Sequence, residues 1–111
     1  MSDATIARML PNEFLEWGLR QALRYELVDG IAYAMAGAKR RHDRIVMNLH
    51  AALVGHLRGH RCVPFSADTA VRIPSGNIRR LDAGVDCAQS EDDAVAADEP
   101  YLVFEVLSPS T

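Results

Sequence analysis

The sequence predicts a domain of the mixed α/β (α+β) class, in which several strands and at least two helices share one core. An Asp29-Gly30 pair between two apolar runs predicts a hairpin, because a type I′ turn needs positive φ at both central positions. Apolar residues recur at helical spacing over residues 39–58. Residues 101–107 form an apolar run of the length typical of a strand that is buried on both faces.

Composition sets the broad class of the protein. The chain has 111 residues, 49% hydrophobic and 24% charged, which is the balance of a globular domain. The net charge of -3 argues against a simple DNA-coating role, since such proteins carry a basic excess. No run is long enough to span a membrane and no signal-peptide pattern begins the chain, so we expect a cytoplasmic protein.

The two cysteines, Cys62 and Cys87, match neither a zinc motif nor a redox pair. We therefore expect two reduced, buried thiols, because free cysteine is among the most buried residue types.

The first element is a helix that follows a short leader. Residues 1–10 are expected to form a flexible leader, and residues 11–111 a single domain. Pro11 suits the first position of a helix, so we predict a helix over residues 11–23, with Gly18 as its weak point.

The hairpin and the longest helix come next. Two antiparallel strands are expected within residues 25–35, around the Asp29-Gly30 turn. A helix over residues 39–58 follows, and Gly59 is a plausible stop for it.

The second half of the chain predicts short strands and turns. Strands are expected over residues 61–65 and 68–73, a turn over 74–77, one or two strands over 78–87, and an acidic loop over 89–98. After the apolar strand over residues 101–107, Ser108-Pro109-Ser110 resembles the start of a helix, with a serine cap and proline in the first turn. We therefore expect a C-terminally truncated, incomplete domain.

Glu105 is the residue that points most directly to chemistry. A carboxylate inside a buried strand is costly unless a cation compensates it. One interpretation is an ion pair at the strand end with Arg72, Arg79 or Arg80. The other is a bound metal ion.

Two further strands each offer one carboxylate. Asp82 taken alone is a turn residue, and Glu26 taken alone is a solvent-facing strand residue. Together with Glu105, however, they indicate a Mg²⁺ site, since Mg²⁺ prefers oxygen ligands. Such a site can orient a phosphodiester, acidify an attacking water and stabilise the leaving oxygen.

The histidines and a basic run leave two interpretations open. His42 is either a surface residue or a contact to phosphate or carboxylate near the site. His50, His56 and His60 lack a metal-binding pattern and are interpreted as surface or packing residues. The basic run at the start of the long helix is either solvated or touches a nucleic-acid backbone; it comprises Lys39, Arg40, Arg41 and Arg44.

Several of these segments occur together in the order found in one known protein family. The chain resembles the Uma-type putative restriction endonuclease family of the PD-(D/E)xK nuclease superfamily, from Pro11 to its last residue. The matching segments are residues 14–17, 25–30, 33–37, His42 with Asn48 and Leu49, and 103–111.

The resemblance implies a restriction-endonuclease-like fold, a mixed sheet flanked by helices, and a DNA endonuclease that depends on Mg²⁺ or Mn²⁺. It implies that Glu26, Asp82 and Glu105 are the catalytic metal ligands and that His42 matches a recurrent histidine of the site. The chain departs from the family at Leu81, where a proline is usual. A lysine that the family carries on the helix after the Ser-Pro-Ser-Thr segment has no counterpart here.

Two functions follow as hypotheses. The first is a Mg²⁺-dependent DNA endonuclease domain. Its activity in this chain alone is expected to be weak or absent, because the missing lysine is the residue that polarises the phosphate or the attacking water. The second is a non-catalytic remnant or protein-interaction module that keeps the nuclease fold. A homodimer is plausible in either case, since an exposed sheet edge invites a partner.

Overall fold

The strands of the domain divide into two sheets. The computed structural model describes residues 8–88 and 91–107. In this part of the chain the element order is α1 (Pro11–Gly18), β1 (Tyr25–Val28), β2 (Ile31–Ala34), α2 (Arg40–Leu57), β3 (Val63–Ser66), β4 (Ala70–Arg72), β5 (Ile78–Arg79), β6 (Ala83–Asp86), β7 (Ala96–Ala97) and β8 (Leu102–Phe104). The predicted α+β class is confirmed.

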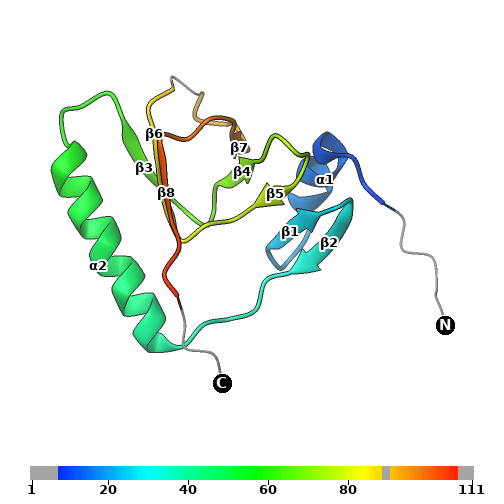
Figure 1. Cartoon of the computed structure of the whole chain (residues 1–111), viewed down its shortest axis with the longest axis horizontal. Coiled ribbons are helices and arrows are strands. Elements are labelled where there is room, and N and C mark those ends of the chain that lie inside the picture. Colours follow the sequence, from blue (N-terminus) through cyan, green and yellow to red (C-terminus); the bar gives the residue numbers. More distant parts are fainter. Residues whose placement is uncertain (1–7, 89–90, 108–111) are drawn as a thin grey trace.

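A five-stranded sheet has the order β2-β1-β5-β4-β7, and a three-stranded sheet has the order β3-β6-β8. The pairing of β4 with β7 is parallel and the other pairings are antiparallel, so the strands are mixed in direction. Helix α2 lies beside the three-stranded sheet, and α1 lies at the other end of the molecule beside β1 and β2 (Figure 1). This arrangement is consistent with a restriction-endonuclease-like fold. The chain crosses from one sheet to the other between β5 and β6, over residues 80–82.

The hairpin and the core of the larger sheet form as their sequences predict. Asp29 (φ 52°) and Gly30 (φ 82°) both have positive φ, as a two-residue turn requires. The strands it joins bring Leu27 into the core, where it is fully buried with Phe14 of α1 and Ile78 of β5. This core holds α1 against the five-stranded sheet.

Helix α1 is shorter than predicted. It begins at Pro11, and the Glu13 carboxylate accepts a hydrogen bond of 2.9 Å from the Leu10 N–H, which satisfies one of the free amides of the helix start. It ends at Gly18, so the predicted end at residue 23 is wrong. Glycine costs about 1 kcal/mol in a helix. The Trp17 ring beside it packs on the ring of Tyr25 in β1, with the two ring centroids 4.8 Å apart, so the chain turns toward the sheet here.

Helix α2 forms over the predicted segment and lies on the smaller sheet. Its half-buried side chains face β3 and β6, and none of its residues is fully buried. Gly59 follows with φ 81°, the left-handed conformation that ends helices. Among the described residues, no helix combines the length and the apolar character needed to cross a bilayer.

The last strand is shorter and more exposed than predicted. The expectation of a strand over residues 101–107, buried on both faces, is wrong: β8 covers Leu102–Phe104 and lies at the edge of its sheet. Leu102 and Val103 are 47% and 46% exposed. Strand β8 pairs with β6 along one edge, and no strand among the described residues pairs with its other edge. The helix start predicted at Ser108-Pro109-Ser110 lies outside the described residues.

The acidic segment over residues 89–98, predicted as a loop, contributes a short strand. Ala96 and Ala97 form β7, which pairs in parallel with β4. Two alanines carry no strand signal of their own, so this pairing comes from the tertiary structure.

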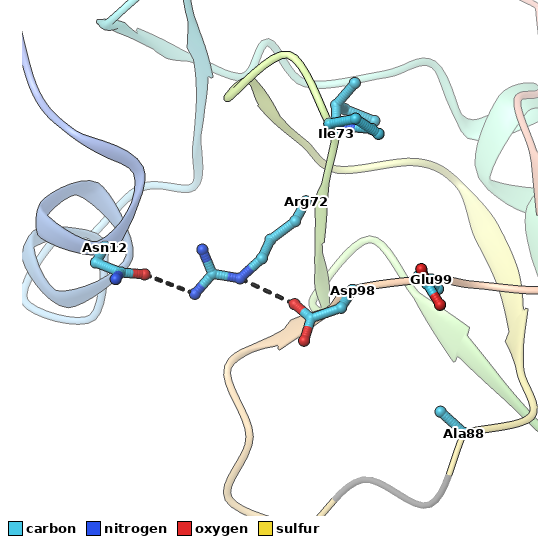
Figure 2. A pocket seen from close by; sticks show the side chains of 7 residues that line it. Asn12, Arg72, Ile73, Ala88, Asp98 and Glu99 are labelled. Carbon is cyan, nitrogen blue, oxygen red and sulfur yellow. Dashed lines mark hydrogen bonds and ion pairs between the residues drawn. The ribbon is translucent and has the colours of Figure 1, made fainter.

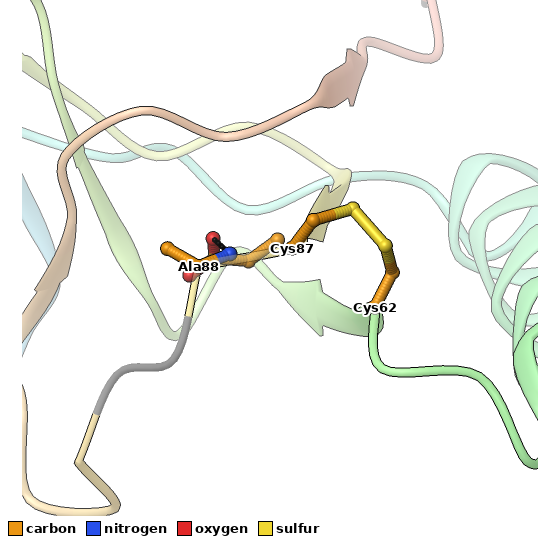
Figure 3. The surroundings of a disulfide bond; sticks show 4 residues. Cys62, Cys87 and Ala88 are labelled. Carbon is orange, nitrogen blue, oxygen red and sulfur yellow. Dashed lines mark hydrogen bonds between the residues drawn. A yellow bond between two sulfur atoms is a disulfide. The ribbon is translucent and has the colours of Figure 1, made fainter.

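The two cysteines form a disulfide, so the prediction of reduced thiols is wrong. Cys62 comes one residue before Val63 and Cys87 one residue after Asp86. Because Val63 and Asp86 are paired in the antiparallel β3–β6 ladder, the two cysteines lie opposite each other. Their sulfur atoms are bonded, which joins the start of β3 to the end of β6 (Figure 3). Both residues are half-buried rather than buried.

A glycine in β6 is required by the side chain opposite it. Gly84 pairs with Phe65 of β3, and a Cβ added at Gly84 would lie 2.1 Å from Cζ of the Phe65 ring. We expect Gly84→Ala to lower the free energy of unfolding by about 1–3 kcal/mol, the usual cost of overpacking. Urea denaturation measures this change.

Gly55 on α2 is the matched control, because nothing lies within 4 Å of a Cβ placed there. Gly55→Ala is expected to stabilise the protein by about 0.5–1 kcal/mol, since alanine favours helix. Equal stability of Gly84→Ala and the wild type would contradict the packing of the Phe65 ring over Gly84.

Candidate functional site

Asp82 lies where three parts of the chain meet. It stands one residue before β6, close to the start of α2 and to the segment after β8. Its Oδ2 accepts a hydrogen bond of 2.7 Å from the Val106 N–H and lies 3.2 Å from Nε2 of His42. The side chain is only 19% exposed, so its orientation is held from two sides.

Two histidines of α2 contact Asp82 from the same face of the helix. Nε2 of His42 lies 2.9 Å from the Val106 carbonyl as well as beside the Asp82 carboxylate. Nε2 of His50 lies 2.8 Å from the main-chain carbonyl of Asp82. Because a carbonyl oxygen only accepts, each histidine must carry a hydrogen on Nε2. His42, read from the sequence as either a surface residue or a carboxylate contact, makes the carboxylate contact.

Glu105 lies opposite Asp82. The β6–β8 ladder pairs Ala83 with Phe104, and one further step along it places Asp82 beside Glu105. Partial burial raises the pKa of Glu105, and the charge of Asp82, a hydrogen bond between the two side chains and the charge of Glu26 raise it further. The side chains of Asp82 and Glu105 therefore lie close together. Glu105 follows the end of β8 and is exposed, so the expectation of a carboxylate inside a buried strand is wrong.

Glu26 of β1 is held by the segment that joins β5 to β6. Its Oε2 accepts hydrogen bonds of 2.7 Å from the Arg80 N–H and 3.3 Å from Nε of Arg79. The Glu26 side chain is 19% exposed, so the alternative of a solvent-facing residue is wrong. Glu26 is near enough for its charge to act on Glu105, although arginine and backbone groups of residues 79–80 hold it.

The arginines that the sequence offered as partners of Glu105 have other partners. Arg79 pairs with Glu26. The Arg80 side chain donates to three carbonyls, those of Tyr25, Ala67 and Asp68, and so ties β1 to the turn after β3.

Arg72 lies in a separate hollow of about 890 Å³. There its guanidinium donates to Asn12 of α1 at 2.8 Å and pairs with Asp98 at 2.9 Å (Figure 2). This hollow contains none of the residues predicted for chemistry, and its arginine is already neutralised by Asp98.

Asp82, His42 and His50 line an open groove of about 820 Å³. The start of α2 forms one side, and residues 22–24 and 35–38 form the other. Arg40, a member of the predicted basic run, lines the groove together with Arg24. The groove thus places Arg40 together with Asp82 and Asp43, while Arg24 pairs with Asp68 at 3.4 Å.

The donor atoms suit a hard divalent cation. Among the described residues, no three His, Cys, Asp or Glu side chains stand ready arranged as a metal-binding group. The register nevertheless places Asp82 opposite Glu105, and the charges of Asp82 and Glu26 both act on Glu105. Carboxylate oxygens are what Mg²⁺ and Mn²⁺ prefer, and Mg²⁺ usually takes only one or two carboxylates and keeps several waters. The pair therefore fits such an ion.

The repulsion within this pair gives a prediction about stability. A carboxyl group whose pKa is raised in the folded protein is more easily ionised after unfolding, so ionised Glu105 destabilises the fold at neutral pH. Glu105→Gln is therefore expected to raise the free energy of unfolding in EDTA by about 0.2–1 kcal/mol, the size typical of partly exposed charges. Chemical denaturation at pH 7 measures it, with the exposed Glu16→Gln as control. A Glu105→Gln variant less stable than wild type would contradict the contact.

Comparison with known proteins gives the chain its family. The family described as "Putative restriction endonuclease" (Uma2) matches residues 11–111. An uncharacterized protein of Synechocystis sp., slr1290, is 34% identical over 111 residues, which cover 98% of this chain and 58% of that protein. The chain thus spans less than two thirds of the length of this relative. No solved structure matches the chain. On the family match, this chain belongs to the Uma2 family of putative restriction endonucleases.

Proposed function

We propose that this domain binds Mg²⁺ or Mn²⁺ between Asp82 and Glu105 and hydrolyses phosphodiester bonds of DNA. The observation that carries the proposal is the β6–β8 register, which places Asp82 opposite Glu105, so that the charge of Asp82 raises the pKa of Glu105 when no cation is bound. Membership of a restriction endonuclease family agrees with this chemistry.

The residues of the chain would hold the site as follows. The Val106 N–H and the His42 imidazole orient the Asp82 carboxylate. Glu105 supplies the second carboxylate from the end of β8. Glu26, a third ligand in the resemblance, adds negative charge and stays anchored by residues 79–80 unless it turns toward the ion. A bound divalent cation would acidify a water and offset charge on the phosphate.

DNA would approach along the groove beside α2. The exposed basic run at the start of this helix supplies cations that can contact phosphates, and Arg40 reaches the groove itself. A helix N-terminus also attracts phosphate through its free N–H groups. Positive charge thus lies in the same groove as Asp82, although the whole chain is acidic with a net charge of -3.

Cleavage of supercoiled plasmid tests the proposal. We expect nicking that requires Mg²⁺ or Mn²⁺, stops with EDTA, and falls by at least about 100-fold in Glu105→Ala. Glu99→Ala is the control, since Glu99 is exposed and lines the hollow around Arg72. Circular dichroism verifies folding, and light scattering reports whether one chain or two are present, because β8 is an exposed edge.

Two outcomes separate the alternatives. Cleavage that is equal in the wild type and Glu105→Ala would refute the proposed site. A folded wild-type domain that binds the metal and cuts nothing at any Mg²⁺ or Mn²⁺ concentration would support the non-catalytic module that keeps the nuclease fold.

A further inference from the structure

We infer that His50 is a positioning residue for Asp82. This inference rests on the proposed function, because it concerns the carboxylate through which that function works. His50 lacks a metal-binding pattern, so it is interpreted from the sequence as a surface or packing residue. Its contact is with the main-chain carbonyl of Asp82, and an acceptor that every residue carries cannot be identified from a sequence motif.

The hydrogen bond from His50 goes to the main-chain carbonyl of Asp82, a residue that lies outside the paired part of the sheet. The pairing of β6 with β3 and with β8 begins at Ala83, so Asp82 lies just outside both ladders. Nε2 of His50, part-buried on α2, lies 2.8 Å from the Asp82 carbonyl and donates to it. A polar group that is partly buried at a strand end needs such a partner.

The two histidines fix Asp82 at both ends. His42 contacts the carboxylate and His50 contacts the carbonyl. They stand two turns apart on one face of α2, with half-buried Val46 between them. A fixed carbonyl restricts rotation of the peptide plane after Asp82, and with it the direction in which the side chain leaves the backbone. The carboxylate is therefore held for a cation before the cation arrives.

Mn²⁺ affinity tests this role without reference to cleavage. We expect His50→Leu, which keeps apolar volume and loses the N–H, to weaken the Mn²⁺ Kd by about 10–100-fold, as loss of an outer hydrogen bond usually does. His50→Gln keeps a donor and should stay within about threefold of the wild type. His56→Leu, at an exposed position of the same helix, should bind as the wild type does. All are titrated well below their melting temperatures, so that a mere loss of stability does not change Kd.

The outcomes distinguish the two claims. If the wild type binds Mn²⁺ and His50→Leu binds it equally well, the inference fails and the proposed function stands. If the wild type binds no Mn²⁺, both fail. Should His50→Leu not fold, the histidine nitrogens of the wild type decide by NMR: a hydrogen on Nε2 of His50 supports the role, and a hydrogen on Nδ1 alone overturns it.

Discussion

Asp82→Asn is expected to reduce both Mn²⁺ affinity and plasmid cleavage by at least about 100-fold, as large a loss of cleavage as that expected for Glu105→Ala. The substitution removes the negative charge that faces Glu105 and leaves a neutral amide, which is a poor ligand for a divalent cation. An amide oxygen can still accept from the Val106 N–H and from His42, so the fold should remain.

Asp82→Ala should add a loss of stability to the loss of function. Without the carboxylate, the Val106 N–H loses its acceptor in a site that is largely shielded from water, while the His42 N–H keeps the Val106 carbonyl. The expected cost is about 1–3 kcal/mol, as for other unsatisfied polar groups. Asp93→Asn is the control, because Asp93 is exposed and distant from the site along the chain.

The measurements are Mn²⁺ titration, plasmid cleavage and urea denaturation of the three variants side by side. An Asp82→Asn protein that cleaves plasmid at the wild-type rate would remove Asp82 from the chemistry. An Asp82→Ala protein as stable as the wild type would show that the hydrogen bond from Val106 and the contact with His42 contribute little.

Loss of the disulfide is expected to have the largest effect on stability. The bridge joins cysteines separated by 25 positions in sequence, and closing a loop of this length removes entropy from the unfolded chain. The expected loss of unfolding free energy is ~3 kcal/mol for a variant that carries both Cys62→Ser and Cys87→Ser. That is a large fraction of the stability of a small domain.

Thermal and urea unfolding with and without dithiothreitol measure this effect. The wild type should lose stability on reduction, and the double serine variant should not respond. Two thiols that react freely in the folded, non-reduced wild type would contradict the bridge. In a reducing compartment the reduced protein is the relevant form, and the same experiment gives its stability.

The elements that the sequence predicted well are those with strong local signals. The Asp29-Gly30 turn needs only its own two residues to favour positive φ. The helix over residues 40–57 repeats its apolar face over several turns, so neighbours can shift its ends but not its existence. By contrast, the end of α1 at Gly18 combines a local signal, the glycine, with a tertiary contact of Trp17 with Tyr25 that no local pattern reveals.

The pairings that bring distant residues together depend on strand register, whether they were expected, as for Asp82 and Glu105, or missed, as for the cysteines. Asp82 meets Glu105, and Cys62 meets Cys87, because each pair stands one step beyond an observed ladder. The sequence names these residues without giving the order of the strands that bring them together. Likewise, the apolar residues of β8 do not indicate whether the strand lies inside its sheet or at its exposed edge.

One signal for His50 was present in the sequence. His42, Val46 and His50 follow at helical spacing, so they share one face of α2. A histidine one turn beyond Val46, on the face that carries a site residue, could have been predicted to point toward the same site. The identity of its partner, a main-chain carbonyl, required the structure.

The most direct test of the central claim is a crystal structure of this domain grown with Mn²⁺, read from its anomalous difference density. We expect a peak between the carboxyl groups of Asp82 and Glu105, with the side chain of Glu26 near it. Density that is empty at this position in a crystal saturated with Mn²⁺, with the two carboxyl groups still hydrogen-bonded to each other, would contradict it.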